Sequence, residues 1–459
     1  MTKKAIAFPA AAAALLGAVI LSFFITEYSL QLRAVGVLGA CLILWISEAM
    51  PISLSSLMMI CLLPFLGLMS FNDALSNFGV NTALFIMASS GITIALSDGA
   101  IPKFLTNLMM KKFGGKPRLL ILGTALLVTV FSAFVSSLAT CALFTALIVS
   151  ALKSSGIRAG QTNLGKALML TVPACAGIGG FMSPAGTPAN ILVIDLLKQQ
   201  GIEITFLKWC AVGFPVGIPA ALLFALSVML VFKPEKDLNP VVYSEVKFSP
   251  ADIKTLVIVS AVIVGWFLTS FLPVISPTIV ALLGLSVMFL PCFDLLDMKK
   301  FSSGVNWDLV LAMGSVSILM TAVSGTGLLS DISGALFGNI SSLSPVLIMI
   351  IISLVICLLR AFIPTTTAVI ALFAPMLISV SQTTGLRIAP LLMTASFWAA
   401  SALLLIYTEP IYLISYKEGY FSEADLLKTG ALPSLILCVA ATLGIAGITQ
   451  LLGMRMTVY

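Results

Sequence analysis

Hydroxyl side chains gather inside a long apolar run in the first half of the chain. Residues 132–140 read SAFVSSLAT and lie within apolar sequence that extends over about 119–152. At these positions a lipid bilayer would demand apolar side chains. Within a membrane, backbone that leaves the helix is tolerated only where protein or a water-filled cavity satisfies it. The serine cluster therefore indicates a polar binding site at membrane depth.

A second polar patch interrupts an apolar run in the other half of the chain. Residues 360–368 read RAFIPTTTA and lie within apolar sequence from Pro345 to about Val380. Paired breakable patches at corresponding positions of two halves are typical of the binding site of a secondary transporter. We therefore expect the rest of the chain to bring these two patches together.

Composition requires a membrane protein. The chain has 459 residues, of which 60% are hydrophobic and only 9% are charged, whereas soluble domains carry roughly 25% charged residues. Many apolar runs reach the length of roughly 20 residues that spans a bilayer. The net charge of +6 comes from basic residues in loops, which report topology and indicate no nucleic-acid partner. The absence of His excludes a histidine proton relay and a histidine metal site.

The charges around the first patch predict a re-entrant hairpin. Basic loops at 103–118 and 153–166 flank the apolar run, and positive loops stay in the cytoplasm. The run then enters and leaves on the same side, with the serines at its tip, as a hairpin over 119–152. The alternative is a single kinked helix that crosses the membrane.

Each half also contains a helix that is interrupted at membrane depth. Residues 183–190, which read SPAGTPAN, interrupt an otherwise apolar segment at 166–199, and two prolines with a glycine are sufficient to break a helix. In the second half, the residues YTEP at 407–410 interrupt the segment 388–416. We expect both breaks to face the binding site.

The chain reads as two inverted repeats. Residues 75–81 (LSNFGVN) are echoed by 301–306 (FSSGVN), and a self-match of this kind outweighs any single local motif. The second hairpin, at 344–382, has flanks that are poor in Lys, so we expect it to open outward. The predicted divisions are an N-terminal extra helix at 1–29, a first repeat at 30–232, a cytoplasmic linker at 233–254 and a second repeat at 255–459.

Several motifs together resemble one family. They are WISEAMP at 45–51, the FG turn at 78–79, GGFMSPAGTPAN at 179–190 and GYF at 419–421. Their order and spacing, over nearly the whole chain, are similar to those of the divalent-anion/sodium symporter family, within the ion-transporter superfamily of elevator-type carriers.

The resemblance implies a fold and a mode of action. The fold is an all-α polytopic membrane protein with about eleven transmembrane helices, each of roughly 20 residues, and two opposed re-entrant hairpins. A transport domain would move against a rigid scaffold, and the carrier would be a homodimer in the inner or plasma membrane. Its substrates would be di- or tricarboxylates or sulfate. We expect the N-terminus in the cytoplasm and the C-terminus outside.

The resemblance also carries over to individual residues. The residues expected to hold substrate oxygens are Ser136, Ser137, Leu138, Thr187, Pro188, Thr365, Thr366, Thr367 and Thr408. The residues that match the family's first sodium site are Ser132, Ser136, Ser137 and Gly186. Sodium is thus the candidate coupling ion, and no other cofactor is expected. The family's tip sequence is Ser-Asn-Thr, and this chain lacks the asparagine at both tips, so substrate and sodium coupling are both open.

Arg360 and Glu409 are the two charged residues at the depth of the second tip and the second break. Ionisable groups inside a membrane are costly and are functional candidates by default. Three interpretations stay open: a structural ion pair that replaces the second sodium site, direct contact between Arg360 and substrate, and a coupling proton on Glu409.

The sequence therefore favours a secondary active transporter of small organic anions, with di- or tricarboxylates as the first choice. It would work by an elevator mechanism, as an exchanger or as a cation-coupled symporter. The alternatives are a carrier of sulfate or another inorganic oxyanion and a channel-like anion permease, although no filter-like motif is present. No enzyme is expected, because the sequence has no HExxH, GxSxG or His cluster.

Overall fold

The protein is helical throughout the part that the structure describes. The computed structural model describes residues 3–47, 49–97, 99–235, 246–272, 274–328, 343–360, 363 and 366–453. Within these residues, nine helical segments are long and apolar enough to cross a membrane. The prediction of an all-α polytopic membrane protein is confirmed.

The helices of the first half follow one another with short connections. In chain order they are α1 (Lys3–Phe24), α2 (Ser29–Ser47), α3 (Ile52–Leu62), α4 (Phe71–Ser76), α5 (Val80–Ser97), α6 (Ala100–Phe113), α7 (Pro117–Phe134), α8 (Ser137–Ser154), α9 (Asn163–Phe181), α10 (Pro188–Gln199) and α11 (Phe206–Phe232). A short 3-10 helix, η1 (Thr26–Tyr28), joins α1 to α2.

The second half begins after the linker. Its helices are α12 (Pro250–Leu268), α13 (Pro277–Met288), α14 (Met298–Gly304), α15 (Trp307–Ser324), α17 (Pro345–Arg360), α18 (Thr366–Thr384), α19 (Ile388–Ala400), α20 (Pro410–Tyr416) and α21 (Glu423–Leu451), with the 3-10 helix η2 (Ile406–Thr408) before α20.

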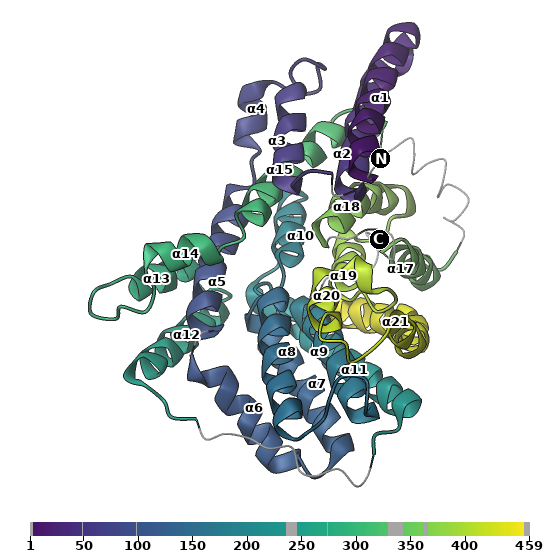
Figure 1. Cartoon of the computed structure of the whole chain (residues 1–459). Coiled ribbons are helices and arrows are strands. Elements are labelled where there is room, and N and C mark those ends of the chain that lie inside the picture. Colours follow the sequence, from purple (N-terminus) through teal and green to yellow (C-terminus); the bar gives the residue numbers. More distant parts are fainter. Residues whose placement is uncertain are drawn as a thin grey trace.

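These helices form two groups, and each group packs more extensively within itself than against the other. The α5 group consists of α2, α3, α5, α12, α13 and α15, which pack on one another. The hairpin group consists of α7 to α11 and α17 to α21. In Figure 1, α5 and α12 to α14 lie on one side of the molecule, and α7 to α9, α20 and α21 lie on the other. Elements from both sequence halves contribute to each group.

The first hairpin is a pair of helices with a two-residue tip. The helices α7 and α8 lie side by side along α9 (Figure 1), and the chain between them leaves the helical conformation at Val135, which is extended, and at Ser136. The Ser137 backbone N–H and its hydroxyl both donate to the carbonyl of Gly186, at 3.3 and 3.2 Å. The tip therefore rests on the break between α9 and α10.

Each break is held by a buried donor and by a glycine of the next long helix. In the first break, the Asn190 amide donates to the carbonyls of Gly180 at 2.8 Å and Ser183 at 2.6 Å, so backbone acceptors freed by the break are satisfied. The Met182 carbonyl approaches Gly213 of α11 so closely that a side chain there would collide with it. Gly430 of α21 has the same relation to the Leu403 carbonyl in the second break.

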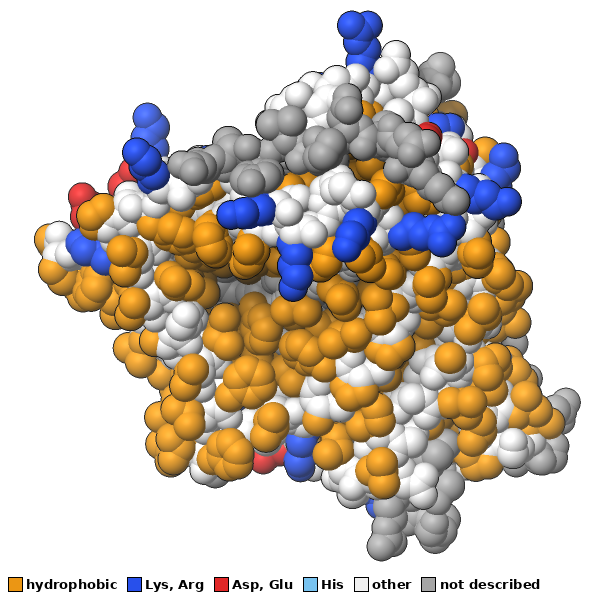
Figure 2. Space-filling view, turned by 90° about the horizontal axis from the view of Figure 1, so that it is seen from below, with side chains coloured by type: hydrophobic (Ala, Val, Ile, Leu, Met, Phe, Trp, Pro, Cys, Tyr) orange, Lys and Arg blue, Asp and Glu red, His pale blue; other side chains and the backbone are white. Residues whose placement is uncertain are grey.

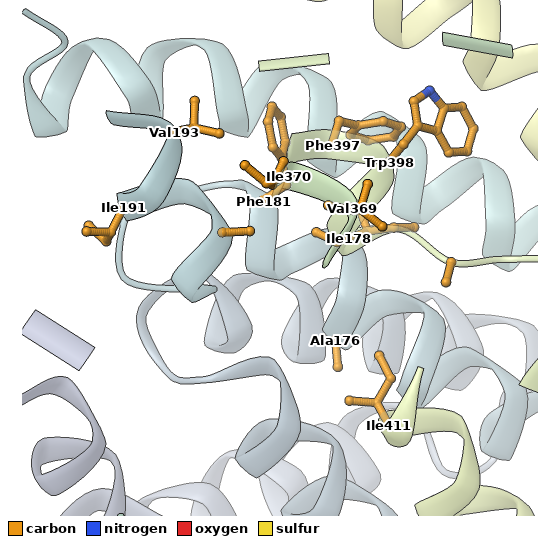
Figure 3. Packing of buried hydrophobic residues seen from close by; sticks show 14 of the residues in the cluster. Ala176, Ile178, Phe181, Ile191, Val193, Val369, Ile370, Phe397, Trp398 and Ile411 are labelled. Carbon is orange, nitrogen blue, oxygen red and sulfur yellow. The ribbon is translucent and has the colours of Figure 1, made fainter. Parts of the chain in front are cut away.

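Buried aromatic rings join the two interrupted helices. Phe181 of α9 meets Phe397 of α19 edge to face, with ring centroids 5.4 Å apart. Figure 3 shows these rings in one cluster with Val369 and Ile370 of α18. An edge-to-face pair contributes about 0.5–1.5 kcal/mol of stability beyond that from burying its two rings. The packing therefore ties α9, α18 and α19 into one body.

The surface is that of a membrane protein. Figure 2 views the molecule from the end where α6 lies in Figure 1, and it shows a row of Lys and Arg side chains bordering a broad hydrophobic surface. Exposed apolar side chains of this kind, such as Leu230 and Leu435, suit contact with lipid, whereas a soluble monomer rarely exposes large apolar patches. The basic row marks one border of the lipid-facing surface.

Candidate functional site

A small cavity lies where the first hairpin tip, the first break and α5 meet. Its volume is about 30 Å³, far below the roughly 300–1,000 Å³ of pockets that hold small-molecule ligands. The cavity is lined by Phe85, Ile86, Ser89, Ser90, Thr93, Ser136, Pro184, Ala185, Gly186, Thr187, Pro188, Ile191 and Leu309. A larger solute can enter only if the two groups of helices separate at this cavity.

Two helix N-termini point into this region. Ser136 is the residue before α8, Thr187 is the residue before α10, and neither side chain caps its own helix. Helix N-termini carry unpaired N–H groups and a partial positive charge, so they attract anions. Because α8 and α10 have 18 and 12 residues, both are long enough for this effect. The hydroxyls of Ser136 and Thr187 add donors at the same place.

The opposite wall of the cavity comes from α5 and was missed from the sequence. The hydroxyl of Ser89 donates to the Phe85 carbonyl at 2.8 Å, and that of Ser90 donates to the Ile86 carbonyl at 2.7 Å. The available signal was the helical spacing of the polar side chains Thr82, Ser89 and Thr93, which lie along one face of α5.

The residues matched to a first sodium site are brought together. The Ser132 hydroxyl lies 2.6 Å from the Ala176 carbonyl and 3.3 Å from the Ser137 hydroxyl. A side chain at Gly186 would meet the Ser132 carbonyl at 2.8 Å. The oxygens are therefore close, but the Ala176 and Gly186 carbonyls already accept hydrogen bonds from these serines. In this arrangement they form no open cage for a cation.

Arg360 lies buried at the end of α17, with only 1% of its surface exposed. Its Nε donates to the Ala399 carbonyl at 3.1 Å, and Nη1 donates to the Thr408 carbonyl at 2.6 Å and to that of Ile363. Nη2 forms an ion pair with Glu409. One guanidinium thus links the second hairpin to both sides of the second break.

The structure separates the predicted substrate residues into two sets. Ser136, Thr187 and Pro188 line the cavity, whereas Leu138 points outward with 42% of its surface exposed. The Thr408 hydroxyl donates to the Leu405 carbonyl at 2.6 Å.

The second hairpin tip is only partly described. Thr366 is half-buried at the start of α18 and is not among the lining residues of the cavity. Thr365 and the side chain of Thr367 lie outside the described residues. The binding roles of the tip residues therefore stay predictions.

The fold and the site are those of a membrane carrier with paired hairpins and interrupted helices. The family described as "Citrate transporter" matches residues 42–395, and the chain belongs to this family. It is thus a secondary transporter of anions, and the resemblance found in the sequence motifs is confirmed.

Individual relatives are distant but extend over most of the chain. An uncharacterized transporter of Haemophilus influenzae is 24% identical and covers 88% of each chain. A sodium-dependent high-affinity dicarboxylate transporter 3 of Caenorhabditis elegans is 21% identical and covers 89% of this chain and 81% of that protein. The sodium-dependent dicarboxylate transporter SdcS of Staphylococcus aureus is 22% identical, with coverage of 85% and 81%.

A solved structure shows a similar fold. The YdaH transporter of Alcanivorax borkumensis, described as having an unusual topology, superposes with a TM-score of 0.56 at 13% identity. The match covers 84% of this chain and 89% of that one. At this identity the likeness concerns the fold alone.

Proposed function

We propose that this protein exchanges small carboxylates, of the di- or tricarboxylate class, across the membrane. The observation that carries the proposal is the cavity at which the N-termini of α8 and α10 meet the hydroxyls of Ser136 and Thr187. Such a site stabilises a carboxylate through N–H and O–H donors, with no fixed positive charge. The dicarboxylate transporters among the relatives support the same class of substrate.

The movement that we propose is a displacement of the hairpin group against the α5 group. The cavity lies at the border of the two groups. Away from the cavity, the groups meet where Phe206 of α11 stacks on Trp266 of α12 and where α15 packs against α18. A cavity of about 30 Å³ is too small for a dicarboxylate, since pockets for small-molecule ligands measure roughly 300–1,000 Å³. An elevator movement would open the site to one side of the membrane at a time.

We propose exchange as the mode of coupling because of Arg360. Its guanidinium lies among three backbone carbonyls and the Glu409 carboxylate, an oxygen-rich environment that would also suit a bound cation. Arg is effectively always protonated, so this charge cannot leave during the cycle. A carrier with a fixed cation at this position would return only when loaded with substrate, which is exchange.

Two alternatives follow from specific observations. Sodium symport is supported by the close oxygens of Ser132, Ser137 and Gly186 and by the names of the sodium-dependent relatives. A carrier of sulfate is supported by the same anion-attracting helix N-termini. A channel-like permease is opposed by the small volume of the cavity.

Counterflow in proteoliposomes tests the proposed function. Vesicles loaded with unlabelled succinate, citrate, malate or sulfate are diluted into trace labelled substrate, and uptake is compared with that of empty vesicles. We expect transient accumulation of label with a carboxylate inside, and none with sulfate. Equal uptake by loaded and empty vesicles, with no overshoot, would indicate a channel.

A further inference from the structure

Asp195 in α10 reaches across to the α5 group. Its carboxylate accepts a hydrogen bond from Asn81 Nδ2 at 3.1 Å and another from the Thr82 hydroxyl. The Asn81 Oδ1 in turn accepts from the hydroxyl of Thr278, at the start of α13, at 2.7 Å. Four polar side chains thus join the hairpin group to two helices of the α5 group. Hydrogen bonds to an ionised carboxylate are stronger than those between neutral groups.

Asn81 is used differently from its counterpart in the second repeat. Asn306 occupies the corresponding place in the Gly-Val-Asn motif, and its side chain accepts from the Leu309 N–H at 3.1 Å, which caps its own helix α15. The Asn81 amide instead uses its nitrogen on α10 and its oxygen on α13. The same motif position therefore serves a local cap in one repeat and a contact between the two groups in the other.

The contact lies on the face of α5 that also forms the cavity wall. Thr82 is followed on that face by Ile86, Ser89 and Thr93, which line the cavity. A displacement of α10 along α5 must therefore break the bonds to Asp195. The carboxylate is half-buried and lies one turn before exposed Lys198, so water can solvate it once it is released.

We propose that Asp195, Asn81, Thr82 and Thr278 form a latch that holds the two groups in the conformation described here and opens in every transport cycle. An interaction changes a conformational equilibrium only if it differs between the two states, and the latch provides such a difference. The inference rests on the proposed movement of the hairpin group, but it requires no particular substrate.

Cross-linking tests whether the latch must open. In a background with the exposed Cys61 and Cys292 replaced by Ser, the pair Thr82→Cys and Asp195→Cys is bridged by a short bifunctional thiol reagent. We expect the bridge to stop carboxylate exchange and cleavage of the bridge to restore it. The matched control is Ser53→Cys with Asp308→Cys, which joins α3 to α15 within the α5 group and should leave at least half of the exchange rate. Undiminished exchange by the Thr82–Asp195 bridged protein would overturn the latch.

A second measurement needs no substrate and therefore separates the latch from the proposed function. A cysteine at Thr187, which is only 5% exposed, is labelled by a bulky thiol reagent only when the cavity opens. Asp195→Ala should accelerate labelling by roughly tenfold, which corresponds to about 1.4 kcal/mol. Asp308→Ala, which removes a carboxylate that binds Ser53 within the α5 group, should not accelerate it. If Asp195→Ala leaves the labelling rate unchanged, Asp195 is merely a structural contact and the proposal is wrong, whatever the protein transports.

Discussion

At the scale of single residues, the two polar patches have different surroundings. Ser136 faces the cavity, whereas Arg360 is enclosed by backbone carbonyls and by Glu409. Under the proposed function the first patch offers donors to a solute, whereas the second fixes a charge within the fold. The difference has a physical origin. Most N–H groups of the Arg360 guanidinium already donate to carbonyls and to Glu409, so few donors are left for substrate.

Ser136→Ala should weaken carboxylate binding and leave the fold intact. The lost hydrogen bond to a charged group is worth on the order of 1.5–3 kcal/mol, or roughly ten- to a hundredfold in affinity. Half-saturation of counterflow measures the effect, and Ser150→Ala, an exposed serine on the same helix, is the control. Normal affinity in the Ser136 variant would place the site elsewhere.

Arg360→Ala should destabilise the protein strongly. The substitution leaves the Glu409 carboxylate and three carbonyls without their donor, and breaking a buried ion pair typically costs about 3–5 kcal/mol. The melting temperature of the purified protein measures the effect. Because Arg360→Ala with Glu409→Gln leaves no unpaired charge, this double variant should recover part of the loss. Equal melting temperatures for the wild type and Arg360→Ala would contradict a stabilising role for the buried Arg360 guanidinium.

At the scale of elements, both interrupted helices are seated in the same way. Each break places a carbonyl against a glycine of the following long helix, Gly213 on α11 and Gly430 on α21. Prolines and glycines revealed the breaks in the sequence, because they interrupt helices wherever they lie. The close contacts between these glycines and the carbonyls could not be predicted, because nothing in the sequence of α11 or α21 signals that a distant carbonyl will approach.

Gly430→Ala should lower the melting temperature, because the added methyl group would collide with the Leu403 carbonyl. Overpacking of this kind costs about 1–3 kcal/mol. Gly447→Ala on the same helix is the matched control, since its methyl group would meet open space and Ala is the better helix former. A smaller decrease in melting temperature for Gly430→Ala than for Gly447→Ala would show that Gly430 is not closely packed against the Leu403 carbonyl.

The topology of the two hairpins can be tested by labelling. In the background without Cys61 and Cys292, Ser154→Cys at the end of α8 should react only with a reagent on the cytoplasmic side. Thr383→Cys at the end of α18 should react only from outside, because the two hairpins are expected to be inverted. Both residues are exposed. Labelling of both from the same side would contradict two opposed hairpins.

At the scale of the whole molecule, composition and motif order were enough for the class of protein and its family. The positions of the polar patches were also apparent, because polar residues stand out in apolar sequence. The α5 wall of the cavity and the contacts of Asp195 were not, because they depend on how α5 and α10 meet in space. Their charge at membrane depth marked Arg360 and Glu409 as functional candidates in the sequence. The carbonyl partners of Arg360 could not be predicted, because they depend on the backbone of the second break.

In the proposed mechanism the protein exchanges carboxylates, and a fixed cation, Arg360, takes the place of a mobile one. The most direct measurement is uptake of a labelled carboxylate into proteoliposomes, with and without an inward sodium gradient, each with and without internal carboxylate. We expect uptake that requires internal carboxylate and does not respond to sodium. Uptake into empty vesicles that is driven by the sodium gradient would contradict it.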